Sequence, residues 1–312
     1  WGRDTLISLE GFLLQKGRLD EAFSILKTFA SFETKGVLPN MFPTLGSNPA
    51  YNTVDASLWF IHASQKWLDY GGSHELFKKH LWPSIRNVLD YYIAGTSYHI
   101  KADSNDGLIW AGEEGYQLTW MDAKVDDFVV TPRRGKPVEI NALWYRALKI
   151  GVALSEKFAG DIHQKQLWLN YLDKVQNNFS RKFFDEQAEV LRDVVDGPDH
   201  QDEFRLRPNG LYVLALSPEL LSPAQAQKAL LKIEENLKTP YGFRSLAPYD
   251  PSYKGKYEGD IWARDLAYHQ GTVWAFLVGV YSDAVLNVRG HTKAQKQYLS
   301  DYLQPLLDHS TN

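Results

Sequence analysis

Residues 117–145, QLTWMDAKVDDFVVTPRRGKPVEINALWY, join a segment without periodicity to the start of a helix. The first part shows neither the helical spacing of apolar residues nor the alternation that is typical of a strand. Apolar residues then return at helical spacing and predict a helix over about 138–157. The stretch is therefore either a long surface loop or the rim of a pocket, and the remainder of the sequence has to decide between them.

Helical periods dominate the remainder of the chain, and strand alternation is nearly absent. Ser73 and Ser222-Pro223 are typical helix starts, and Gly71-Gly72 is a typical helix end. Residues 96–136 have no helical period and predict a long loop region. Including the helix above, the spacing predicts about ten helices, near 5–15, 19–32, 53–70, 73–93, 138–157, 160–182, 208–216, 222–237, 270–286 and 291–308.

The order of these helices indicates hairpin pairs, because short connections alternate with long loops rich in Gly, Pro, Tyr and Trp. Each helix of a pair must bury one face against its neighbours. An open α-solenoid would show a repeat of fixed period, and the sequence has none. We therefore predict an all-α toroid in which alternate helices line the inside and the long loops gather on one rim.

The composition of the chain excludes several classes of function and structure. The chain has 312 residues, a net charge of −4 and no cysteine, which excludes disulfides and thiolate metal sites and argues against nucleic acid as partner. The absence of cysteine is compatible with a cytoplasmic location. The longest apolar stretch, residues 273–281, is about half of a membrane span, so no membrane association is expected. The 10 Trp, 17 Tyr and 15 Phe residues indicate either an aromatic core or a sugar site.

Two segments place carboxylates at helix starts. Arg3 and Asp4, in WGRDTLISL, are either a surface cation and a helix cap or a pair that binds sugar hydroxyls. Asp55, in YNTVDASLWFIHA, either favours the helix dipole or points into the mouth of the toroid beside Trp59.

The segment LTWMDAK contains the best candidate for a general acid. Asp122 lies beside Trp120, and a carboxyl against apolar surface has a raised pKa, as a general acid requires. Lys124 would act against this, since a nearby cation lowers the pKa. Glu139 and Asn141 follow in the first turn of the next helix, where both also fit ordinary helix-start chemistry.

Further polar and aromatic residues are predicted at helix starts: Asn209 in RPNGLYVLAL, and His269 and Trp274 in YHQGTVWAF. Each is weak evidence alone, because a single His is usually structural. In a toroid, however, the starts of alternate helices converge on one rim. No nucleotide-binding, zinc or serine-hydrolase motif is present, and neither a cofactor nor a metal is expected.

Seven blocks, in order and over nearly the whole chain, resemble the carboxy-terminal catalytic domain of glycogen debranching enzymes, the amylo-α-1,6-glucosidase family. The quoted segments carry the resemblance, together with TPRRGKPVEINALWY and TPYGFRSLAP. The resemblance implies an (α/α)6 barrel that removes α-1,6-linked glucose stubs from glycogen or a branched α-glucan and inverts the anomeric centre. It implies Asp122 as general acid and Arg3 and Asp4 as ligands of the glucose hydroxyls. The blocks that contain Asp55, Trp120, Lys124, Glu139, Asn141, His269 and Trp274 match the pocket lining of the family. From their positions at helix starts, Trp59 and Asn209 are expected to bind substrate as well.

At the position of the family's general base, this chain departs from the eukaryotic pattern. Eukaryotic members carry a catalytic Glu where this chain has Val273, in HQGTVW. Prokaryotic members share the form seen here and have a later Glu beyond the last helix. We therefore expect residues 1–312 to be a single domain that lacks one helix at each end. The base is either Glu139 or a residue outside the chain, and Glu139 could instead position Lys124 or Arg133. An inverting pair would stand ~6.5–9.5 Å apart.

Two other functions remain open at this point: a glucoamylase- or trehalase-like glucosidase with another linkage preference, and a non-catalytic glucan-binding toroid.

Overall fold

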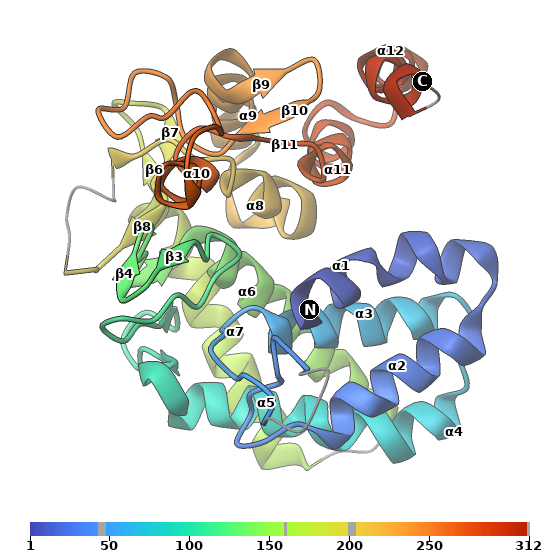
Figure 1. Cartoon of the computed structure of the whole chain (residues 1–312). Coiled ribbons are helices and arrows are strands. Elements are labelled where there is room, and N and C mark those ends of the chain that lie inside the picture. Colours follow the sequence, from blue (N-terminus) through green and yellow to red (C-terminus); the bar gives the residue numbers. More distant parts are fainter. Residues whose placement is uncertain (43–47, 159–160, 199–203, 311–312) are drawn as a thin grey trace. The chain divides into compact units, whose positions relative to one another are not determined.

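The computed structural model describes residues 1–42, 48–158, 161–198 and 204–310 (Figure 1). Helices hold 58% of the chain, which confirms the prediction of a mostly helical protein. The residues fall into two compact units, each built from two stretches of sequence. Unit 1 consists of residues 1–120 and 143–177, and unit 2 of residues 121–142 and 178–312.

In the described part of unit 1, the strands β1 and β2 form one short pair among helices and loops. Helix α3 packs against both α1 and α2, and α5 contacts α3 and β1. The middle of the unit is filled by aromatic side chains such as Phe60, Tyr92 and Trp144, all fully buried. Two of them are also bonded to the backbone, since Tyr92 donates to the carbonyl of Val54 and Trp144 to that of Gly107. The elements of unit 1 are α1 (Gly2–Phe12), η1 (Leu14–Lys16), α2 (Leu19–Ser31), α3 (Ala56–Asp69), α4 (His74–Leu76), η2 (Phe77–Leu81), α5 (Trp82–Ala94), η3 (Ser97–His99), β1 (Lys101–Ala102), β2 (Ile109–Trp110) and parts of α6 (Val138–Lys157) and α7 (Ile162–Phe183).

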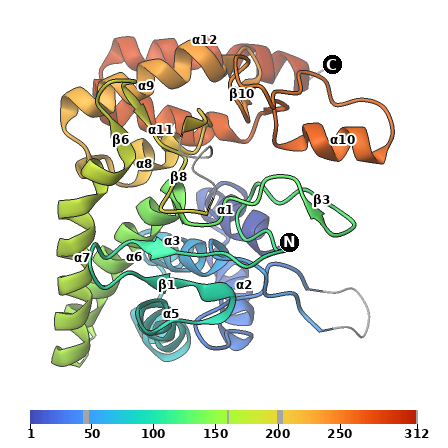
Figure 2. The ribbon, with the colours of Figure 1, turned by 90° about the vertical axis from the view of Figure 1, so that its left-hand side faces the viewer.

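Unit 2 combines a helical layer with small antiparallel sheets. Helices α8, α9 and α11 pack against one another, and α12 packs on α11 (Figure 2). The largest sheet has three strands in the order β11–β10–β9 and supplies the buried Phe243 to the helical layer, against Tyr281. The elements of unit 2 are β3 (Lys124–Val125), β4 (Phe128–Val129), β5 (Lys136–Pro137), β6 (Phe184–Asp185), β7 (Val190–Leu191), β8 (Val194–Val195), α8 (Gly210–Leu216), η5 (Pro218–Leu220), α9 (Pro223–Leu237), β9 (Lys238–Thr239), β10 (Gly242–Arg244), α10 (Ile261–Tyr268), β11 (Val273–Trp274), α11 (Leu277–Arg289) and α12 (Lys293–Ser310).

Local signals placed several helices well. Helix α6 spans Val138–Lys157, as predicted. The side chain of Ser222 caps α9 in a complete capping box, and Ser73 accepts a hydrogen bond from Leu76 at the start of α4. These signals are reliable because a cap satisfies backbone N–H groups that the helix itself leaves unpaired.

The predicted helix over 73–93 is not continuous, since a π-helical turn at Phe77–Leu81 separates α4 from α5. Pro83 lies at the start of α5 and has no N–H for the backbone ladder. Its ring also crowds the carbonyl four residues earlier, at Lys79. The wider π turn ahead of the proline accommodates both effects.

The region around residues 261–276 differs most from the prediction. An unpredicted helix, α10, ends at Tyr268, and the helix expected over 270–286 begins only at Leu277 as α11. Between them, Val273 and Trp274 join the three-stranded sheet through β10. Gly271 has a φ of +146°, which a helix does not allow, so the chain turns here instead of continuing.

Among the helices that the structure describes, none has the length and apolar character that crossing a bilayer requires.

Candidate active site

The predicted site residues of unit 1 centre on a buried ion pair. Nε of Arg3, in the first turn of α1, donates to Oδ2 of Asp55 over 2.6 Å. Oδ1 of Asp55 accepts from the hydroxyl of Thr53, which also accepts from the N–H of Ala56 at the start of α3. Thr53 therefore caps the start of α3, and Asp55 fixes the position of the Arg3 guanidinium. Asp4, by contrast, is exposed.

Two tryptophans of the predicted site are buried in the same unit. Trp59 is 7% exposed and packs edge-on against His62, with ring centroids 5.5 Å apart. Trp120 is 8% exposed.

Asp122 lies in unit 2 and is half-buried. Both of its neighbours are anchored by residues that the sequence had singled out. The N–H of Ala123 donates to Nδ1 of His269 over 3.4 Å, and the amide of Asn209 donates to the sulfur of Met121 over 3.7 Å. The backbone after Asp122 and the side chain before it are thus both held, which limits the positions open to the Asp122 carboxyl.

His269 lies at the end of α10 and Trp274 in strand β11, so neither lies at the predicted helix start. His269 is buried, and its ring stacks on that of Trp274 at a centroid distance of 5.4 Å and an angle of 12°. Because Nδ1 of His269 accepts this hydrogen bond, the Nδ1 atom itself carries no proton in this arrangement. The stack and this bond together fix the orientation of the imidazole beneath Ala123.

A buried cluster of four charges lies in the same unit, and we call Arg133, Glu139, Asp193 and Arg207 the charge quartet. Arg133 donates to both oxygens of Glu139 and also bonds Asp193, through Nε at 2.7 Å and Nη2 at 3.0 Å. Nε of Arg207 lies 3.5 Å from Oδ2 of Asp193. Each member is at most 3% exposed. Two cations and two carboxylates leave the quartet neutral, which is the condition under which such burial is tolerated.

The pKa values within the quartet follow from its burial. For Arg133, burial opposes the charge most strongly, but Asp193 and Glu139 outweigh it and raise the pKa, so the guanidinium stays charged. For Glu139, burial raises the pKa, and Arg133 offsets only part of this effect.

The quartet is connected to the anchors of Asp122. Asn209 donates to Oδ1 of Asp193 over 2.7 Å with the same amide group that contacts Met121. Arg207 donates to the carbonyl of His269 over 2.7 Å and to Oε1 of Gln270 over 2.9 Å. Both anchors are therefore fixed by the same buried cluster.

Glu139 has two predicted roles, as general base and as the residue that positions Arg133. Both of its carboxylate oxygens are bonded to Arg133, as expected for a residue that positions this arginine. A role as general base stays a prediction. Asn141 is fully buried and donates to the carbonyl of Pro137, and Lys124 is half-buried in β3.

Sequence reasoning missed Asp193 and Arg207 as parts of this arrangement. Arg207 is two residues from Asn209 in a segment that was singled out, whereas Asp193 lies just before β8 without a local signal. Within the described residues, no group of three or more His, Cys, Asp or Glu side chains could hold a metal ion.

Comparison with known proteins identifies one family and several solved structures with a similar fold. The family model described as amylo-alpha-1,6-glucosidase matches residues 1–312. The glycogen debranching enzyme of Saccharomyces cerevisiae is 26% identical over 97% of this chain. The chain spans only 26% of that relative's length.

Among solved structures, the chain is similar to GH63 mannosylglycerate hydrolase from Thermus thermophilus. The complex with Tris has a TM-score of 0.71 and 14% identity, over 99% of this chain and 85% of that one. The complex with glucose has a TM-score of 0.68 and 16% identity, over 98% of this chain and 84% of that one. The rhamnosidase from Klebsiella oxytoca has a TM-score of 0.58 and 14% identity, and the match covers 98% of this chain but 48% of that one. At these identities the likeness shows a shared fold.

Proposed function

Because this chain belongs to the amylo-α-1,6-glucosidase family, we propose that it removes single α-1,6-linked glucose residues from the branch points of glycogen or a related α-glucan. The family supports a glycoside hydrolase, and the linkage and substrate are our proposal. As architecture we propose one (α/α)6 domain over residues 1–312.

The observation that carries the proposal is the setting of Asp122. A general acid has to meet the glycosidic oxygen at hydrogen-bond distance, so its backbone must be fixed. The bond from the N–H of Ala123 to His269 holds the backbone directly after Asp122, and the contact of Asn209 with the sulfur of Met121 holds the side chain before it. We propose that Asp122 donates the proton to the leaving group, with a second carboxylate activating water on the opposite face of the sugar.

Sugar recognition in this proposal uses Arg3 and Asp55, together with Asp4, Trp59, Trp120, Lys124, Asn141, Asn209, His269 and Trp274. The ion pair of Arg3 with Asp55 supports such a role because it fixes the orientation of a buried guanidinium, a group suited to hydrogen-bonding hydroxyls.

The test compares glucose release from isomaltose and α-glucosyl-cyclodextrin with release from maltose and trehalose. We expect the first two to be hydrolysed faster, and Asp122→Asn to lower kcat by about 10²- to 10⁴-fold. Asp126→Asn, on an exposed neighbouring loop position, is the matched control and should keep the wild-type rate.

Other outcomes select other functions. Faster hydrolysis of maltose or trehalose identifies a glucoamylase- or trehalase-like enzyme. Sugar binding without glucose release, unchanged in Asp122→Asn, identifies a glucan-binding protein. The anomer that forms first, read by proton NMR, should be β-glucose if the reaction inverts an α-linkage.

Glu139→Gln separates the two roles of Glu139. If Glu139 is the base, kcat falls by a factor similar to that of Asp122→Asn. If Glu139 only positions Arg133, the variant loses stability, and the remaining folded protein keeps most of its kcat.

A further inference from the structure

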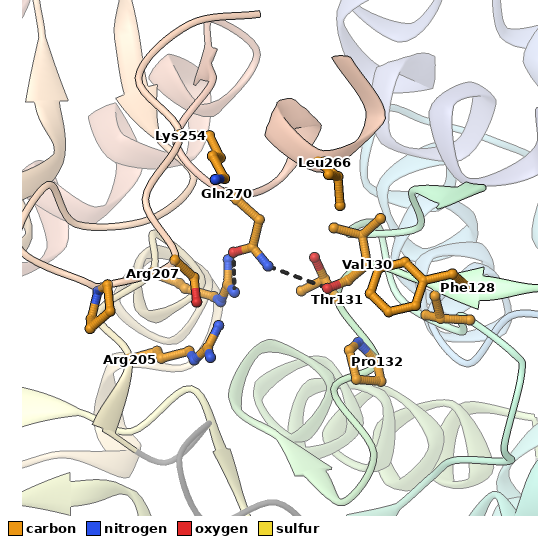
Figure 3. A pocket seen from close by; sticks show the side chains of 12 residues that line it. Phe128, Val130, Thr131, Pro132, Arg205, Arg207, Lys254, Leu266 and Gln270 are labelled. Atoms are coloured by element: carbon orange, nitrogen blue, oxygen red, sulfur yellow. Dashed lines mark hydrogen bonds between the residues drawn. The ribbon is translucent and has the colours of Figure 1, made fainter. Parts of the chain in front are cut away.

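A pocket of unit 2 shares Arg207 with the charge quartet, but none of the residues proposed to contact the scissile glucose lines it. It has a volume of about 480 Å³, which is within the range of small-molecule sites. Residues of β4 and the loop after it form one wall, and segments around Arg205, Lys254 and Gln270 form the other (Figure 3). The lining consists of Phe128, Val129, Val130, Thr131, Pro132, Arg205, Arg207, Pro251, Ser252, Lys254, Leu266 and Gln270.

Hydrogen bonds hold the walls of this pocket in place. The side chain of Gln270 accepts from Arg207 and donates to the carbonyl of Val130, so it joins the two walls. The N–H of Lys254 donates to the carbonyl of Gln270 over 2.6 Å. This approach requires Gly271, since a Cβ there would lie 2.3 Å from the carbonyl oxygen of Lys254. The pocket is therefore formed before any ligand arrives.

An exposed aromatic pair stands at this pocket. Phe128 is 50% exposed and lies against Trp262, which is 45% exposed, with ring centroids 5.8 Å apart. Trp262 precedes the lining residue Leu266 by one turn of α10 and so shares its face. Large aromatic rings left open to water beside polar groups are typical of binding surfaces, and apolar sugar faces pack on such rings.

The polar lining consists mainly of hydrogen-bond donors whose charge is largely compensated. Arg205 lies 4.0 Å from Asp250, and Arg207 belongs to the neutral charge quartet. Lys254 has no ion pair among the described residues and adds one positive charge. The hydroxyl of Thr131 is buried without a hydrogen-bond partner in the described part of the chain. Neutral hydroxyl groups, which both accept and donate, match this lining better than a phosphate does.

We propose that this pocket, with Phe128 and Trp262 at its edge, is a secondary binding site for a neutral α-glucan chain. The chain would pack a glucose face on the aromatic pair and place hydroxyls on Arg205, Lys254 and Thr131. Such a site would hold a neighbouring branch of the polymer while Asp122 acts on the stub. The identity of the sugar rests on the proposed function, whereas the site itself rests on the pocket.

The experiment measures affinity for maltoheptaose and for glycogen, by calorimetry and by electrophoresis in glycogen-containing gels. Phe128→Ala and Trp262→Ala should each weaken glucan binding about three- to tenfold, the range typical of one aromatic contact. Phe12→Ala removes an aromatic ring that is 73% exposed in unit 1 and is the matched control. The rate on isomaltose, which is too short to reach a second site, should stay at the wild-type value in all three variants.

Unchanged glucan affinity in both pocket variants, with thermal melts that show intact folding, overturns the proposal. Binding of inorganic phosphate that is lost in Lys254→Met, without any effect on glucan, also overturns it, because the pocket would then be an anion site. If wild-type protein hydrolyses no α-1,6 substrate but the two variants still lose glucan affinity, the proposed function fails and the secondary site stands.

Discussion

Asp193 is the residue of unit 2 on which the buried charge balance depends most. Its carboxylate accepts from Arg133 at 2.7 and 3.0 Å and from Asn209 at 2.7 Å, and it lies 3.5 Å from Arg207. Asp193→Asn keeps the shape but removes the charge. If the amide oxygen of the new asparagine keeps its bond to Asn209, its NH2 group faces the guanidinium groups of Arg133 and Arg207. Donors would then stand against donors.

The magnitude follows from the number of charges left behind. After the substitution, two guanidinium groups face one carboxylate, so one buried positive charge is uncompensated. Breaking a buried ion pair from one side costs about 3–5 kcal/mol. We therefore expect Asp193→Asn to lower the free energy of unfolding by about that amount.

Urea unfolding at pH 7, followed by tryptophan fluorescence and far-UV circular dichroism, measures this loss. Glu21→Gln is the control, because it removes a carboxylate from an exposed pair with Arg18 and should have no measurable effect. The double variant Asp193→Asn/Arg207→Gln restores charge balance, so it should lose less stability than the sum of the single variants.

Two results would refute this reasoning. One is a loss below about 1 kcal/mol in Asp193→Asn, the size of an ordinary surface effect. The other is strict additivity in the double variant, since additivity means that the two residues do not share a charge network.

Two further predictions concern other parts of the chain. Nδ1 of His62 accepts from Nε of Arg146 at 2.8 Å, and burial, with Arg146 and Lys66, lowers the pKa of His62 to about 3. A lowered histidine pKa stabilises the fold above the unfolded value near 6.5, and this stability is lost as the pH falls toward 3. Between pH 7 and 4.5, urea unfolding should show a loss on the order of 2 kcal/mol, and His62→Gln should flatten this slope; an equal slope in both proteins contradicts the assignment. Gly135 has a φ of +133°, and a Cβ there would lie 2.8 Å from Cα of Gly197, so Gly135→Ala should destabilise by on the order of 2 kcal/mol. Gly11→Ala, in α1 with open space around it, should be neutral or stabilising, and equal thermal melts for the two variants would show that the close approach at Gly135 carries no cost.

Helices with clear local signals could be placed from the sequence alone. Helix α6 is an example, because its apolar period is unbroken over twenty residues. Helix α9 is another, since Ser222 and Gln225 form its capping box from within one short segment. Helix and strand boundaries that are set by contacts with residues far away in the sequence could not be found this way. Val273 and Trp274 fit a helical period but pair with β10 instead, about thirty residues earlier in the chain.

The same distinction holds for the candidate site. Asp122, Asn209 and His269 were selected as unusual polar residues within their own segments, and the structure places Asn209 and His269 on the two neighbours of Asp122. Asp193 had no such signal, because nothing near it in the chain explains a buried carboxylate. Its partners Arg133 and Arg207 are supplied by other loops.

The amino-acid sequence by itself determined the helical character, most helix positions, the family and the candidate acid, because each of these depends on spacing and chemistry within a short window. Only the tertiary structure decided which charges neutralise one another around Arg133 and how the turn at His269 meets Ala123. The physical reason is that a buried charge is stable only beside an opposite charge. That partner can come from any part of the chain that folding brings within hydrogen-bond distance.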